Sequence, residues 1–203
     1  MRELSLHILD VLQNAREGGA RVVWLTIDER VREDRLIIEV ADDGRGMPEE
    51  DMKRVTDPFF TTRKTRHVGL GLPLVAAAAE RCSGGLKIEK ARGQGLRVTA
   101  CFQYGHIDRA PLGDMTRTLL SFLMGEPLCD LVYVHRRDGN TFELDTRLVR
   151  KELEPIPLSH PAVREWLGSY ISEGERGLTD PGEEVVMTPS GTGRMGNAET
   201  QKP

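Results

Sequence analysis

The feature that most constrains this chain is an acidic turn with two glycines, placed directly after an apolar strand. The predicted strand covers residues 36–41, and the turn reads Asp42-Asp43-Gly44-Arg45-Gly46-Met47. Asn14 lies upstream on a predicted helix, and a Phe-Phe-Thr-Thr stretch at 59–62 and a Gly-Leu-Gly-Leu stretch at 69–72 follow downstream. An acidic glycine turn is common by itself, but these four elements in this order predict a nucleotide pocket.

Composition limits the class of protein. With 203 residues, of which 38% are hydrophobic and 30% charged, the chain has the make-up of one medium globular domain with an appendage. Its formal net charge of -4 argues against a nucleic-acid-binding protein, which normally carries a basic surface. No apolar run approaches the roughly 18 residues of a membrane span, and the N-terminus lacks a signal-peptide pattern. Cys82, Cys101 and Cys129 are widely spaced and expected to be reduced thiols. We therefore expect a cytoplasmic protein without a membrane or nucleic-acid partner.

The first half of the chain alternates between helical and strand-like periods. The predicted order is helix, strand, strand, helix, helix, strand, strand, over residues 3–17, 22–27, 36–41, 48–55, 70–81, 86–91 and 95–102. This order predicts an α/β fold, a two-layer sandwich in which helices cover one face of a mixed β-sheet. We assign residues 1–104 to this domain.

Past Tyr104 the pattern changes. Two helical periods, 114–124 and 161–171, flank a predicted hairpin of strands 131–135 and 141–144. We assign 105–173 to a small α+β appendage, either a docking surface or a structural cap. From Gly174 onward Gly, Pro, Glu, Ser and Thr dominate without a period, so residues 174–203 are expected to be a disordered tail.

A polar stripe crosses the first predicted helix. His7, Asp10 and Asn14 fall on one side of it, at i, i+3 and i+7. The stripe could be a solvent edge or a set of satisfied core groups. In a nucleotide pocket, Asn14 would instead offer a neutral oxygen to Mg²⁺, which on phosphates needs only one or two protein ligands. Asp10 would then face the water or hydroxyl that attacks the terminal phosphate.

Asp42, at the end of a buried strand, also has two interpretations. It can be a turn-forming residue next to flexible glycines, as in many β-turns. In a pocket, its carboxylate would accept a hydrogen bond from an exocyclic amine such as adenine N6. Gly44 and Gly46 would then let the backbone approach the base without a side-chain clash.

The glycines at 69–72 directly precede a predicted helix. They leave backbone N–H groups free to point at phosphate oxygens, and the helix N-terminus adds a favourable field. Hydroxyls and positive charge at 61–64 would lie near the same anion, although these basic residues taken alone are better explained as ordinary solvated charge. The stretch is neither the dinucleotide fingerprint nor a P-loop.

Together these motifs resemble the ATP-binding domain shared by histidine kinases, DNA gyrase, heat-shock chaperone ATPases and mismatch-repair ATPases, the GHKL or Bergerat-fold proteins. Residues 10–15 are similar to the family's asparagine-bearing helix, 42–47 to its adenine box, 57–64 to the phenylalanine box of sensor histidine kinases, and 69–72 to the second glycine box. The resemblance covers about residues 3–103 and implies a nucleotide between the helix layer and a lid. The implied nucleotide-binding residues are Asn14, Asp42, Gly44, Gly46, Met47, Phe60, Thr61, Thr62, Lys64, Gly69, Leu70, Gly71 and Leu72, with Asn14 also the metal ligand.

Several positions depart from the family pattern. Asp10 stands where gyrase-like ATPases have a glutamate general base, so as the catalytic base it would have a shorter reach. Glu17 stands where many kinases carry a phosphate-contacting basic residue, and Leu96 replaces a threonine that is frequent near the adenine. Because the asparagine helix begins within a few residues of Met1, we expect no dimerising hairpin with a phospho-accepting histidine before it.

The resemblance implies a protein that binds Mg-ATP and acts with an unidentified protein partner or substrate. The interpretation we favour is a histidine-kinase-like protein that transfers phosphate to, or regulates, a partner in trans. One alternative is a self-sufficient ATPase with Asp10 as general base. Another is a non-catalytic module that senses ATP or ADP.

Overall fold

The computed structural model describes residues 3–52, 54–55, 71–91 and 93–179. They contain one six-stranded sheet with strand order β3-β4-β2-β1-β5-β6. Its strands are β1 (Val22–Arg30), β2 (Arg35–Asp42), β3 (Gly85–Lys90), β4 (Leu96–Gln103), β5 (Asp130–Arg137) and β6 (Asn140–Asp145). The α-helices are α1 (Leu4–Glu17), α2 (Glu49–Met52), α3 (Gly71–Arg81), α4 (Met115–Leu123), α5 (Thr146–Leu153) and α6 (Pro161–Gly177).

Side chains along the strands alternate between buried and more exposed, and this alternation explains the two layers. In β1, Val23, Leu25 and Ile27 are fully buried, whereas the residues between them are half-buried or exposed. Since successive side chains of a strand point to opposite faces, one face of β1 is apolar. The register pairs Leu25 with Val40 on β2 and with Tyr133 on β5, so the same buried face continues across the sheet.

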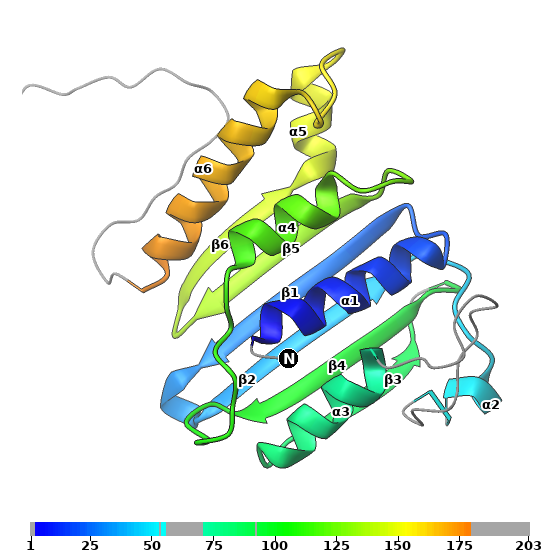
Figure 1. The fold of residues 1–203 in the computed structure, drawn as a ribbon, viewed down its shortest axis with the longest axis vertical. Coiled ribbons are helices and arrows are strands. Elements are labelled where there is room, and N and C mark those ends of the chain that lie inside the picture. Colours follow the sequence, from blue (N-terminus) through cyan, green and yellow to red (C-terminus); the bar gives the residue numbers. More distant parts are fainter. Residues whose placement is uncertain (1–2, 53, 56–70, 92, 180–203) are drawn as a thin grey trace, which may run out of the picture.

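Helices cover that apolar face. Figure 1 shows α1 in the middle, with α3 and α4 on either side of it. Helix α1 buries Leu4, Ile8, Val11 and Leu12, at the spacing of an amphipathic helix. The mixed two-layer α/β architecture predicted from the sequence is therefore confirmed. No helix in the described ranges is long and apolar enough to cross a membrane.

The second half of the chain extends the same sheet. Strand β5 runs parallel to β1, and β6 pairs antiparallel with β5. Helices α4 and α6 contribute Leu119, Phe122, Leu167 and Ile171 to the core cluster that also contains α1. The predicted hairpin is present, but it is not a layer of its own, because residues 105–173 share a sheet and a core with the first half. The assignment of 1–104 and 105–173 as separate units stays a prediction.

Three elements differ from those predicted. Helix α5 was not predicted, and its first turn is capped by the side chain of Asp145, which accepts a hydrogen bond from the backbone N–H of Arg147 at 2.9 Å. Helix α6 runs to Gly177, into the segment assigned to the tail, because it continues to pack against the core and is followed by the buried Leu178. Helix α2 covers only four residues of the predicted 48–55. Residues 180–203, the rest of the predicted disordered tail, lie outside the described residues.

A buried ionic cluster joins α6 to the sheet. His135 on β5 is 2% exposed, and its Nε2 lies 3.0 Å from Oε1 of Glu29 on β1. Its Nδ1 lies 3.0 Å from Oε2 of Glu175 on α6, whose other oxygen accepts a 2.7 Å hydrogen bond from the hydroxyl of Tyr133. Burial acts to lower the pKa of His135, but the hydrogen bonds to the two carboxylates outweigh it and raise the pKa to about 9. His135 is therefore an imidazolium at neutral pH.

Candidate functional site

Two of the predicted motifs meet where α1 and the start of α3 pack together. Gly71 lies against Asp10 and Asn14, so that a Cβ added at Gly71 would overlap the Asp10 carboxylate and lie 3.3 Å from Asn14 Nδ2. Asp10 and Asn14 are both half-buried, on successive turns of α1. A glycine is therefore required here for helix α3 to begin this close to the polar stripe. Sequence spacing suggested both motifs, but only the packing of α3 on α1 brings them into contact.

Asp42 is the last residue of β2, and its carboxylate is buried. It is 9% exposed, and its Oδ1 accepts a 2.8 Å hydrogen bond from the backbone N–H of Gly44. The backbone N–H of Leu96, at the start of β4, also bonds to it. Burial raises the pKa of Asp42, and the hydrogen bonds from Gly44 and Leu96 oppose that shift. The side chain is thus fixed in orientation by the backbone of two different segments.

Asp43, which the sequence analysis did not single out, holds the loop after Asp42 to the start of β1. Oδ1 of Asp43 accepts hydrogen bonds from the backbone N–H groups of Arg21, at 2.8 Å, and Val22, at 2.9 Å. The backbone N–H of Arg45 donates to the carbonyl of Gly18 at 3.1 Å. Because Gly18 is one turn beyond Asn14, these bonds place the Asp42 loop beside the polar stripe of α1. A second aspartate before a glycine was the available signal.

Glycines leave room for this loop. Gly46 has φ +66, and a Cβ there would overlap the carbonyl oxygen of Gln94. Gly95 lies against the carbonyl group of Asp42 in the same way. The sequence analysis assigned Gly95 only to a hairpin turn, whereas in the structure it lets the β3–β4 connection close over the end of β2.

His7, the third member of the polar stripe, lies deeper in the helix layer. It is 7% exposed and lines a cavity of about 20 Å³ between α1, α3 and the sheet. The rest of the lining is apolar, and within the described residues Nδ1 of His7 is a buried atom without a hydrogen-bond partner. Burial therefore lowers the pKa of His7.

The remaining predicted site residues fall into two groups. Met47 is half-buried after the Asp42 loop, and Leu72 packs against the core at the start of α3. The others lie outside the described residues: Phe60, Thr61, Thr62, Lys64, Gly69 and Leu70.

A family model described as "Histidine kinase-, DNA gyrase B-, and HSP90-like ATPase" matches residues 2–106. Sporulation kinase C of Bacillus subtilis is 32% identical over 93 residues, covering 46% of this chain and 22% of that protein. Nitrogen regulation protein NtrY of Azorhizobium caulinodans is 40% identical over 111 residues, covering 48% of this chain and 14% of that protein. The chain thus spans less than a quarter of the length of either relative.

Among solved structures, the MutL ATPase domain of Aquifex aeolicus, complexed with ADP, matches with a TM-score of 0.48 and 14% identity, over 71% of this chain and 64% of that one. The family match covers more than half of the 203 residues and includes α1, the Asp42 loop and α3. The chain therefore belongs to the family of histidine kinase-, DNA gyrase B- and HSP90-like ATPases.

Proposed function

We propose that this chain binds Mg-ATP where α1, the end of β2 and the start of α3 meet, and that it transfers phosphate to, or regulates, a protein partner in trans. The observation that carries the proposal is the contact of Gly71 with Asp10 and Asn14, one helical turn from the loop of Asp42. In the proposed site, three segments distant in sequence would supply a fixed carboxylate, an amide side chain and the first turn of a helix.

Asp42 is suited to recognise adenine. Its carboxylate is already held by the backbone N–H groups of Gly44 and Leu96, and a carboxylate has further lone pairs to offer. In the proposed complex it accepts the hydrogen bond of the exocyclic amine. A pre-fixed acceptor loses little conformational entropy on binding, which favours affinity and selectivity for adenine.

The start of α3 is suited to the phosphates. The backbone N–H groups of its first turn have no partner within the helix, and the positive end of the helix dipole favours an anion there. Gly71 keeps side-chain atoms out of the space beside Asp10 and Asn14. In the proposed complex Asp10 orients the hydroxyl or water that attacks the terminal phosphate.

Asn14 and Asp10 fit a magnesium–phosphate group by their chemistry. Mg²⁺ prefers oxygen ligands and takes only one or two of them from the protein when it is bound to phosphates. Asn14 would hold the ion, which when bound neutralises charge on the transferred phosphate. The name of the matched relative Sporulation kinase C supports phosphate transfer over hydrolysis.

Adenine recognition is tested by measuring ATP affinity calorimetrically for the wild type, Asp42→Asn and the matched control Asp43→Asn. Asp42→Asn turns an amide N–H₂ group toward the adenine amine, so affinity should fall at least tenfold, on the order of the loss for an unpaired polar contact. Asp43→Asn keeps an acceptor oxygen and should bind ATP nearly as the wild type does. If Asp42→Asn binds ATP with unchanged affinity and has an unchanged unfolding curve, Asp42 does not bind adenine.

The metal role is tested by repeating the titration with Asn14→Asp, with and without Mg²⁺. A new carboxylate should change the magnesium dependence of ATP affinity more than the affinity measured in a chelator. Equal loss under both conditions would argue that Asn14 contacts the nucleotide and not the metal.

Hydrolysis without a partner is the second candidate, and the contact of Asp10 with Gly71 favours it. Phosphate release from Mg-ATP separates the two. Turnover that disappears in Asp10→Ala and in Asp42→Asn would establish a self-sufficient ATPase. Tight binding without turnover would favour a kinase or nucleotide sensor that needs its partner.

A further inference from the structure

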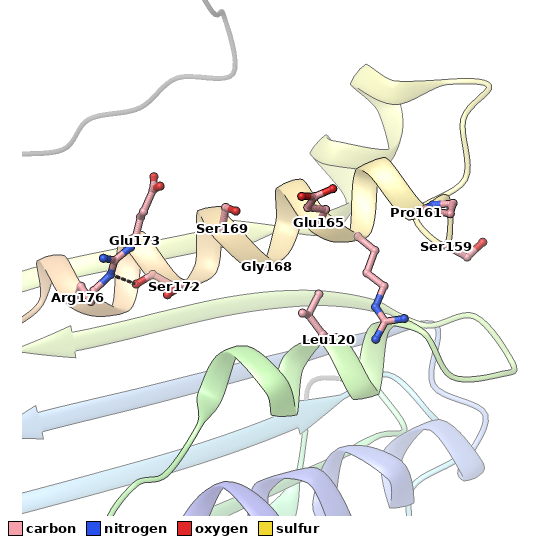
Figure 2. A pocket seen from close by; sticks show the side chains of 10 residues that line it. Leu120, Ser159, Pro161, Glu165, Gly168, Ser169, Ser172, Glu173 and Arg176 are labelled. Atoms are coloured by element: carbon pink, nitrogen blue, oxygen red, sulfur yellow. Dashed lines mark hydrogen bonds between the residues drawn. The ribbon is translucent and has the colours of Figure 1, made fainter.

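Helix α6 lies at the opposite edge of the sheet from α3 (Figure 1). A groove of about 660 Å³ runs beside α6 (Figure 2). Four of the α6 side chains that line it are Glu165, Ser169, Ser172 and Arg176. Their spacing is i, i+4, i+7 and i+11, so they form one row along the helix, about 16 Å long. We call these four residues the α6 row.

The α6 row faces away from the core. The buried residues of α6 are Val163, Leu167 and Ile171, which belong to a different side of the helix. Within the described part of the chain, Glu165 has no hydrogen bond or ion pair, and the guanidinium of Arg176 bonds only to the carbonyl oxygen of Ser172, at 3.2 Å. Charged groups at both ends of the row are therefore available to a partner.

The α6 row is complementary to itself when it is reversed. It reads acid, small, small, base along the helix. In an antiparallel pair of α6 helices related by a two-fold axis, Glu165 of each copy lies opposite Arg176 of the other, and Ser169 lies opposite Ser172. Small side chains at the crossing point let two helices approach closely, and opposite charges meet at both ends.

An exposed aromatic residue flanks the row. Trp166 is 45% exposed, and its ring stacks on that of Tyr170 with 5.4 Å between centroids and an interplanar angle of 15°. A partly exposed tryptophan is a typical anchor of protein–protein contacts. It supplies apolar area that the serines of the row do not.

We propose that this face of α6 binds the same face of a second copy of the chain, in an antiparallel pair held by two Glu165–Arg176 ion pairs around the serine crossing. The pairing uses no residue of the proposed nucleotide site. Since a contact confined to one helix is smaller than a standard interface, association should be reversible and dependent on protein concentration. Exposed ion pairs weaken with salt, so added salt should reduce it.

Charge reversal tests the register by sedimentation velocity of the full chain over about two decades of concentration. Arg176→Glu replaces two attractions with two repulsions, and should raise the dimer dissociation constant on the order of tenfold, as should Glu165→Arg. The double variant Glu165→Arg/Arg176→Glu restores opposite charges and should recover the wild-type constant to within about threefold. Arg81→Glu is the matched control, because Arg81 is an exposed arginine at the end of α3, away from α6.

Recovery in the double variant, with no effect of Arg81→Glu, would support this pairing, because a general change in net charge cannot produce it. A dimer whose dissociation constant stays at the wild-type value in both single variants would overturn the proposed register. A wild type that stays monomeric over the whole range would overturn the proposal, and would leave residues 180–203 or a foreign protein as the occupant of the groove.

Discussion

Replacing His135 with glutamine should make the protein less stable and change how its stability depends on pH. In the folded state the imidazolium lies between Glu29 and Glu175, 3.0 Å from an oxygen of each. Glutamine can keep one of these hydrogen bonds but carries no charge. Glu29 would keep its ion pair with Arg137, at 3.2 Å. Glu175 would lose the one positive partner it has among the described residues, and a buried charge left without such a partner is costly.

The pKa of His135 gives the size of the effect. A rise from the ordinary 6.5 to about 9 corresponds to about 3 kcal/mol of folding free energy from this one proton. Because the folded-state pKa lies above the unfolded value, this stabilisation is complete below pH 6.5 and is lost as pH rises through about 9. His135→Gln should therefore lose about 3 kcal/mol at pH 6 and much less near pH 10.

Urea unfolding of the wild type and His135→Gln, repeated between pH 6 and pH 10, measures both quantities. Arg136→Gln is the matched control, because Arg136 is the next residue on β5 but is exposed on the opposite face. The control should keep the wild-type slope of unfolding free energy against pH. If His135→Gln has the same slope as the wild type in this window, His135 is not the group that carries the proton, and the reasoning fails.

Three further changes probe the site and its supports. His7→Leu removes a buried nitrogen without a partner and should stabilise the protein by about 1 kcal/mol at pH 7 in urea unfolding. The difference in unfolding free energy between His7→Leu and the wild type should be larger at pH 5, because the lowered folded-state pKa of His7 makes the wild type lose stability as pH falls below 6.5. A smaller difference at pH 5 than at pH 7 would contradict this. Gly46 has φ +66 and a Cβ there would overlap Gln94, so Gly46→Ala should lower the free energy of unfolding, measured by thermal unfolding, by about 3 kcal/mol. Gly93 has φ +98 but open space around it, so Gly93→Ala should lower it by only about 1 kcal/mol. Equal losses in the two variants would refute the overlap at Gly46. Asp43→Ala frees two backbone N–H groups and should weaken ATP binding about five- to tenfold, whereas Asp43→Asn should stay within about threefold; equal weakening of both would show that the acceptor oxygen is not what matters.

Much of the fold could be predicted because its elements have strong local signals. The period of α1, the alternation in β1 and β2, and the capping of α4 by Asp114 all act within a few residues. Helix α5 was missed because it is short and directly follows a strand, so its period is too brief to recognise. The end of α6 was placed too early because Gly174 and Gly177 look like breakers, whereas packing against the ring of Phe142 favours Gly174 within the helix.

For the candidate site, the sequence indicated the residue types but not their contacts. Asn14, Asp42 and Gly71 stood out through motifs, since each belongs to a short pattern with its own chemistry. Asp43 and Gly95 did not. An aspartate before a glycine indicates a turn, but no spacing in the chain identifies the partners of these two residues, which are the backbone at the start of β1 and the carbonyl of Asp42.

What the sequence determined by itself is the family and the order of helices and strands apart from α5, because periodicity and motifs are properties of neighbouring residues. Only the tertiary structure decided that β5 joins β1 in one sheet, that Gly71 touches Asp10, and that His135 lies between two glutamates. These depend on pairs such as Glu29 and Arg137, 108 residues apart, which meet because burying the shared apolar face of the sheet outweighs the entropy of closing the chain between them. Such pairings follow from the free energy of the whole chain, and no local pattern specifies them.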